Sequence, residues 1–242
     1  MNISLTGIGW VTSDSIGRGR DYSRPPGGRG PIPALSRKVA FDEPFPHFGR
    51  LDTYSKIGIT AIALTLKDAH RYAWEKKRNV GIIASSYSGC FTTDIDYFDT
   101  VLSEGGHLAS PNLFVYTLPN SFLGEAAIRF GLTGTSFVIC EEPLTGLQAL
   151  RFAMESITDG ESDAILAGMC DTGCPDNSTV PIIPVLGAVF CLLEKATRPN
   201  RLSYGEMRED RRGGICFNGI VIENMFSLTQ ICVKTATKVK GF

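Results

Sequence analysis

The fold of this chain is decided by residues 136–146, which run Ser136-Phe137-Val138-Ile139-Cys140-Glu141-Glu142-Pro143-Leu144-Thr145-Gly146. The first five residues form a short apolar run, which is typical of a buried strand. Two acidic residues and a proline then end the run. From Thr145 to Thr158, apolar residues recur at helical spacing and predict a helix with one apolar face, made of Leu147, Leu150, Met154 and Ile157. The stretch therefore predicts a strand, a tight turn and a helix.

The rest of the chain repeats this alternation of strand and helix. Buried strands are predicted at residues 3–11, 79–84, 163–168 and 187–193, the first of them broken by Gly7 and Gly9. An amphipathic helix is predicted from Asp52 to Tyr72, and a further helix from Asn120 to Phe130. Strands that alternate with helices imply a mixed central sheet with helices on both faces. We therefore expect an α/β fold in a single domain, residues 1–242.

Two regions give no clear periodic signal. Residues 17–33 are rich in Gly, Arg and Pro, which predicts a surface loop. The tail, residues 213–242, is of uncertain structure, because residues 221–239 mix β-branched with basic side chains. Closing strands and disorder both fit this mixture. The charged run from Arg208 to Arg212 predicts a solvated turn, with contact to an acidic carrier protein as the alternative.

Composition narrows the class of protein. The chain is 43% hydrophobic and 20% charged, which argues against disorder. A net charge of -1 gives no reason to expect nucleic acid or a membrane surface as partner. No apolar run approaches the roughly 20 residues of a membrane span, and no secretory signal is evident at the N-terminus. Seven cysteines without a repeated spacing indicate free thiols and a cytoplasmic protein. Because Cys170 and Cys174 would need two more ligands, we expect no metal, and we expect no cofactor.

Five blocks along the chain carry a family pattern in their order and spacing. They are Leu5-Thr6-Gly7-Ile8-Gly9-Trp10-Val11, then Ser110-Pro111 through Leu118-Pro119-Asn120 to Phe130-Gly131-Leu132-Thr133-Gly134, then Thr145-Gly146-Leu147-Gln148-Ala149-Leu150, residues 157–168, and Gly187-Ala188-Val189-Phe190-Cys191-Leu192-Leu193-Glu194. Together they resemble the N-terminal half of the β-ketoacyl synthases, condensing enzymes of the thiolase-like superfamily, over about residues 3–210. The resemblance implies a thiolase-like half fold.

The resemblance also locates a catalytic position. In that family a nucleophilic cysteine lies between the buried strand and the helix, three residues before a glycine. The helix N-terminus there favours the thiolate, and backbone N–H groups hold the oxyanion. Counting back from Gly146 places Pro143 at this position. Proline has no nucleophilic side chain but suits the first turn of a helix. We therefore expect residues 141–146, here called the elbow, to keep their shape without the chemistry.

Neighbouring residues offer alternatives to the missing nucleophile. Cys140 lies three positions upstream, and burial as a small apolar side chain is its default role. Glu141 and Glu142 precede the helix, where capping is the plain interpretation and general-base catalysis the bolder one. Because a nucleophile needs an adjacent activating base, and none is evident, catalysis by Cys140 stays an alternative.

The length of the chain is a second departure from the family. The family is about twice as long, and its second half carries two histidines and a lysine that bind and decarboxylate the extender unit. Here none of His47, His70 and His107 follows the elbow. We therefore expect no condensing activity, and an uncovered apolar face that would need a partner or a second copy.

The resemblance finally suggests a role. Degenerate members of the family, called chain length factors, pair with a catalytic ketosynthase and shape its acyl tunnel, and short versions occur in aryl-polyene and related fatty-acid-like pathways. Ser136, Phe137, Val138, Ile139 and Cys140 would form the strand that pairs across the dimer, and Phe114, Val115 and Tyr116 are the tunnel or gate candidates. The leading hypothesis is a non-catalytic partner of a β-ketoacyl synthase in a heterodimer. The alternatives are a stand-alone acyl-transfer enzyme using Cys140 and a homodimer that binds acyl chains or an acyl carrier protein.

Overall fold

A mixed sheet forms the centre of the computed structural model, which describes residues 2–21, 26–27, 30–102, 105–174, 186–196 and 203–240. Nine strands lie in the order β4-β3-β5-β6-β1-β7-β8-β9, with β2 beside β1. Their bounds are β1 Ile3–Thr12, β2 Ile16–Arg18, β3 Val80–Ser86, β4 Ser136–Cys140, β5 Ala164–Asp171, β6 Gly187–Lys195, β7 Gly205–Glu209, β8 Ile215–Phe217 and β9 Ile220–Val221. β3 pairs in parallel with β4 and β5, whereas β6 runs antiparallel to β5 and β1. The predicted mixed sheet is confirmed.

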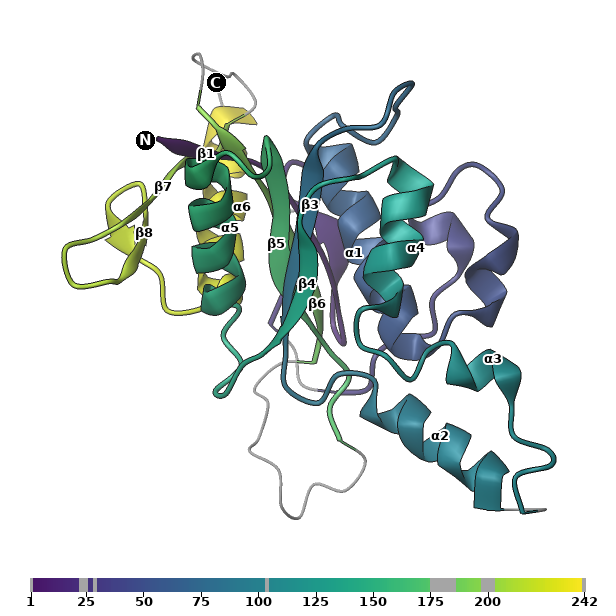
Figure 1. Cartoon of the computed structure of the whole chain (residues 1–242). Helices are drawn as coiled ribbons and strands as arrows, with labels where there is room; N and C mark the ends of the chain where they lie inside the picture. The colour runs from purple at the N-terminus through teal and green to yellow at the C-terminus, as the bar shows by residue number, and fades with distance from the viewer. Residues whose placement is uncertain are drawn as a thin grey trace.

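Helices cover both faces of this sheet, as predicted (Figure 1). Their bounds are α1 Thr53–Asp68, α2 Phe91–Leu102, α3 Pro111–Phe114, α4 Ser121–Phe130, α5 Leu147–Asp159 and α6 Met225–Lys240, with the short 3-10 helices η1 Arg37–Val39 and η2 Pro46–Arg50. α1 and α4 lie on one face, α5 and α6 on the other, and α2 and α3 extend away from the sheet (Figure 1). No described helix is long and apolar enough to cross a membrane.

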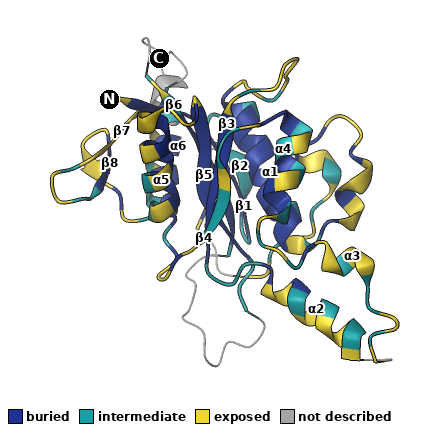
Figure 2. Ribbon diagram, viewed as in Figure 1, coloured by how far each residue is buried: buried dark blue, intermediate teal, exposed yellow. Residues whose placement is uncertain are grey.

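The two faces of the sheet carry separate cores because side chains alternate along each strand. On β5, Leu166 and Cys170 pack with α1 and α4, and Ile165 and Met169 pack with α5 and α6. The central strands are buried along their length (Figure 2), which explains why the sequence shows them as continuous apolar runs.

The glycines of β1 have a different purpose from the one that the sequence suggested. Gly7 and Gly9 do not break the strand, which continues to Thr12. A Cβ on Gly9 would lie 2.5 Å from the backbone N of Thr65, so these glycines let α1 rest directly on the strand. The helix predicted from Asp52 to Tyr72 forms as α1 and ends earlier, at Asp68, but it is buried around nearly its whole circumference and is not amphipathic as predicted.

The segments with weak sequence signals also take definite forms. Gly17 and Arg18 of the predicted loop belong to β2, while residues 22–25 and 28–29 of that loop lie outside the described residues. Arg208 and Glu209 end β7, so only residues 210–212 make the predicted turn. The tail supplies β8 and β9, which extend the sheet as the closing strands that the sequence left open, and the helix α6, which the sequence did not predict.

The helix α6 bears on the expected uncovered apolar face. It packs on the same face of the sheet as α5 (Figure 1), and its Met225, Leu228 and Cys232 are fully buried. Within the described residues, that face is therefore already covered by the chain itself.

Candidate functional site

The elbow connects the end of β4 to the start of α5. β4 ends at Cys140, and α5 begins at Leu147 after Gly146, whose φ of 78° is left-handed and suits glycine. Pro143 is exposed and lies four residues before the first residue of the helix. The structure therefore corrects the expectation that Pro143 occupies the first turn of α5. Pro143, which the sequence analysis assigned to the nucleophile position, has no nucleophilic side chain.

A buried carboxylate occupies the amides at the start of α5. Glu141 accepts hydrogen bonds from the backbone N–H of Gly146, at 3.1 Å, and from the hydroxyl of Thr145. The Thr145 oxygen in turn accepts from the N–H of Leu147 at 3.2 Å. An anion that the helix N-terminus would attract is thus supplied by the chain itself. Glu141 thus acts on α5 only through Gly146 and Thr145, which precede the helix, and Glu142 is exposed to solvent.

Cys140 is an exposed free thiol at the end of β4, rather than the small buried side chain that is the default for cysteine. It lies opposite Ser86 in the parallel ladder of β3 and β4. Among the described residues no hydrogen bond links its sulfur to a base. Cys140 consequently lacks the adjacent base that would activate a nucleophile.

Asp171, which the sequence analysis did not single out, organises the loop beside the elbow. This carboxylate at the end of β5 accepts hydrogen bonds from the backbone N–H groups of Tyr87, at 2.7 Å, and Ser88, at 2.8 Å. It also accepts from the Ser86 hydroxyl and from the N–H of Gly173. Bonds to a buried charge are strong, so Asp171 fixes the loop that leads from β3 into α2. The sequence offered one signal for this role, which is an acidic residue soon after a buried apolar run.

The strand β4 forms one edge of the sheet, and in the described residues its only partner is β3. Ser136 and Cys140 are exposed, and the three residues between them are half-buried, so β4 is not the doubly buried strand that its apolar run suggested. The backbone N–H of Glu141 bonds to Ser86, and the Thr135 carbonyl bonds to Ile82. Because backbone direction alternates along a strand, the amides of Ser136, Val138 and Cys140 face outward. The β4 edge is therefore open to pairing.

Exposed apolar side chains gather on α2 and α3. Phe91, Ile95, Phe98 and Leu102 follow the spacing of one helix face on α2 and are 36% to 64% exposed. We call these four residues the α2 stripe. Phe114 and Val115 are exposed beside them, and the Phe114 ring contacts Tyr97 of α2. Tyr116 is instead buried in the core, so it is not available as a gate.

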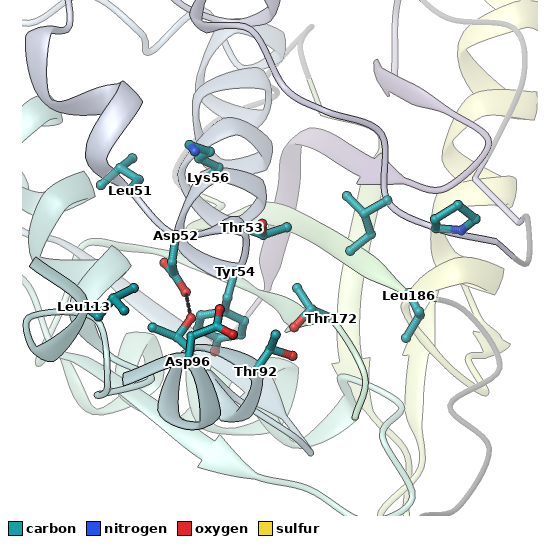
Figure 3. A pocket seen from close by; sticks show the side chains of 13 residues that line it. Leu51, Asp52, Thr53, Tyr54, Lys56, Thr92, Asp96, Leu113, Thr172 and Leu186 are labelled. Carbon is teal, nitrogen blue, oxygen red and sulfur yellow. Dashed lines mark hydrogen bonds between the residues drawn. The ribbon is translucent and has the colours of Figure 1, made fainter. Parts of the chain in front are cut away.

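A cavity of about 440 Å³ lies between the start of α1, α2 and the end of β5 (Figure 3). Asp52 caps α1 through Ser55, and its second oxygen accepts from the Thr93 hydroxyl at 2.6 Å, which ties α1 to α2. The wall mixes apolar side chains such as Ile32 and Leu113 with polar ones such as Thr92, and neither Pro143 nor Cys140 lines it. No group of three potential metal ligands occurs among the described residues.

Comparisons with known proteins agree with this geometry. The family model for the β-ketoacyl synthase N-terminal domain matches residues 11–180. A putative polyketide β-ketoacyl synthase 1 from Streptomyces halstedii is 26% identical over 227 residues, covering 82% of this chain and 50% of the relative. The tetracenomycin polyketide synthase ketoacyl synthase alpha subunit from Streptomyces glaucescens is 32% identical over 128 residues, covering 50% of this chain and 28% of the relative. The chain thus spans half or less of the length of these curated relatives.

Solved structures show the same fold. The ishigamide ketosynthase/chain length factor superposes with a TM-score of 0.65 at 17% identity, over 85% of this chain and 62% of the other. A ketosynthase, ApeO, in complex with its chain length factor, ApeC, from Xenorhabdus doucetiae gives a TM-score of 0.54 at 17% identity, over 100% of this chain and 93% of the other. The thiolase-like ketosynthase fold that the sequence predicted is confirmed.

Proposed function

Because the chain belongs to the β-ketoacyl synthase N-terminal-domain family, we propose that it is a non-catalytic subunit that pairs with a catalytic β-ketoacyl synthase. The pair would act in chain elongation of the fatty-acid or polyketide type, including the aryl-polyene kind. The absence of a nucleophile at Pro143 supports the non-catalytic part of the proposal. The occupied amides of Gly146 and Leu147 support it independently.

The observation that carries the pairing is the open edge of β4. A free row of outward amides at Ser136, Val138 and Cys140 is a ready template for a strand of another subunit. The α2 stripe, with Phe114 and Val115, adds apolar surface of the kind that marks interfaces. We place Phe114 and Val115 toward the partner's acyl tunnel. Solved structures with this fold include a ketosynthase in complex with its chain length factor, and a ketosynthase in complex with its acyl carrier protein.

All seven cysteines are free, which fits a reducing compartment, so we place the pair in the cytoplasm. A self-pairing dimer would use the same β4 edge, since a strand can pair antiparallel with its own copy across a two-fold axis. An acyl carrier protein would then approach the pair as a second partner.

The test is co-purification of the chain with the ketosynthase encoded nearest to it. Val138→Pro removes one outward N–H of β4 and leaves the hydrogen bonds to β3 in place, since proline is tolerated on an edge strand. Val138→Ala keeps the N–H and is the matched control. We expect loss of at least about tenfold in complex for Val138→Pro and little loss for Val138→Ala. Measuring the size of the chain alone distinguishes a homodimer from a subunit that pairs only with the ketosynthase. Selective labelling of Cys140 by an acyl-mimetic electrophile would favour the stand-alone enzyme instead.

A further inference from the structure

One face of α6 is wholly committed to the sheet. Met225, Leu228, Cys232 and Val233 follow helical spacing and are at most 2% exposed. They share one core with Trp10 of β1, on the same side of the sheet as α5. A helix buried in this way is part of the fold, because its apolar side chains contact the core of the sheet and are not available to another surface.

The first residue of α6 rests on the elbow itself. The backbone N–H of Met225 donates to the Thr145 carbonyl at 2.9 Å. A Cβ placed on Gly146 would overlap Cγ of Met225, so the methionine side chain fills the space that the glycine leaves. The elbow is thereby closed by Glu141 through hydrogen bonds and by Met225 through packing.

Side-chain hydrogen bonds determine the residue at which α6 begins. The side-chain oxygen of Asn224 accepts from the N–H of Ser227 at 2.9 Å, and the Ser227 hydroxyl accepts from the N–H of Asn224 at 3.2 Å. Such reciprocal capping bonds satisfy amides that a helix start leaves unpaired. They fix the helix start beside Gly146, and thus place Met225 on the elbow.

Further along, α6 itself carries a buried cysteine. Cys232 is fully buried, and burial, more than its neighbours Cys191 and Asp68, raises the pKa of its thiol well above the ordinary value. This thiol reports on docking, because a reagent reaches it only when α6 leaves the sheet.

We propose that α6 is a permanent cover of the elbow face, which stays docked when the chain pairs and confines any partner to the β4 edge and the α2–α3 surface. The proposal rests on the pairing function proposed above. A partner or further domain that used the elbow face would first have to displace Met225 and the rest of the buried face of α6.

Hydrogen exchange on the full chain, free and in complex with the neighbouring ketosynthase, tests this inference. We expect amides of residues 136–140 to slow by at least about tenfold in the complex, while those of residues 225–236 change by less than about twofold. Faster exchange in α6 on pairing would overturn the inference and leave the pairing function standing. Failure to form any complex would overturn the pairing function instead, and the free chain then tests the cover.

In the free chain, Cys232 labelling by a maleimide is followed by peptide mass spectrometry, with exposed Cys140 as the internal reference. Gly146→Ala should raise the labelling rate of Cys232 at least about tenfold, because its Cβ would overlap Met225. Gly160→Ala is the matched control, since Gly160 has the same φ of 78° but no atom near its Cβ position. In wild type, labelling of Cys232 as fast as that of Cys140 would overturn the cover.

A second pair of variants keeps the test decisive even if Gly146→Ala disturbs the fold. In the Met225→Ala background the obstructing Cγ is gone, so adding Gly146→Ala should change Cys232 labelling no more than Gly160→Ala does. If the Gly146 substitution has the same large effect with and without Met225, then Met225 does not fill the elbow and the inference fails.

Discussion

The carboxylate of Glu141 accepts a hydrogen bond from the backbone amide of Gly146, the residue directly before α5, at 3.1 Å. The same carboxylate accepts from the Thr145 hydroxyl. The chain itself therefore supplies the carboxylate that lies beside the start of α5. The chain keeps the turn and its helix, and uses them for structure.

This bond makes Glu141 a stabilising residue of the elbow. Glu141→Ala leaves the buried N–H of Gly146 without its acceptor, so we expect the free energy of unfolding to fall by about 1–3 kcal/mol. Glu142→Ala, at the exposed neighbour, should change it by less than about 0.5 kcal/mol. Urea titrations of the two variants compare them directly, and equal losses would show that the Glu141 bonds contribute nothing.

The occupied amides also predict the outcome of restoring a cysteine. Pro143→Cys should give no condensation and no acyl-enzyme, because the amides of Gly146 and Leu147 are already bonded to Glu141 and Thr145. The alkylation rate of its thiol should rise with pH and reach half its maximum at about pH 8.5, as for an ordinary cysteine. Mass spectrometry after incubation with an acyl thioester provides the measurement. A stoichiometric acyl adduct at residue 143 would show that the elbow has kept its chemistry.

Asp68 links α1 to two other segments and predicts a pH dependence. Its carboxylate accepts from the N–H of Ile8, at 2.9 Å, and from the hydroxyl of Tyr204, at 2.8 Å, and it pairs with Arg20. Burial is the main cause that raises the pKa of Asp68 above 3.8, against the lowering effect of these bonds. The folded state then binds the proton more tightly than the unfolded chain does, so this contribution to stability falls as pH rises through the raised pKa.

The variant Asp68→Asn isolates that contribution. It should be less stable than wild type, because its amide donates where the carboxylate accepts. The stability difference between the two proteins should narrow as pH rises from 3.8 through the raised pKa of Asp68. Unfolding free energies measured by urea across this range check the slope. A difference that widens over the same interval would show that the bonds from Ile8, Tyr204 and Arg20 dominate the shift.

Part of the fold could be predicted because its signals are local. Apolar runs marked β3 and β5, since a strand covered on both faces needs apolar side chains at every position. Helical spacing marked α4 and α5 to within two residues at their starts. The missing nucleophile at Pro143 was likewise readable, because it depends only on spacing from Gly146.

Other features required the assembled sheet. Val138 has an open edge because no described strand pairs with it beyond β3, a property of strand order that an apolar run does not encode. Tyr116 was a gate candidate by position in the chain, but packing against the α1 and α4 core buries it. Asp171 acts through the amides of Tyr87 and Ser88, which lie more than 80 residues away in the chain.

By itself the sequence therefore determined the α/β class and the family, since both depend on short-range pattern. Only the tertiary structure decided that Ile231 and Val233 belong to a helix, because intrinsic preferences of β-branched residues are weak beside the burial of Met225, Leu228 and Cys232. It also decided that the elbow is occupied. Met225 packs on Gly146 only once the tail lies across the sheet, which brings together residues that are far apart in the chain.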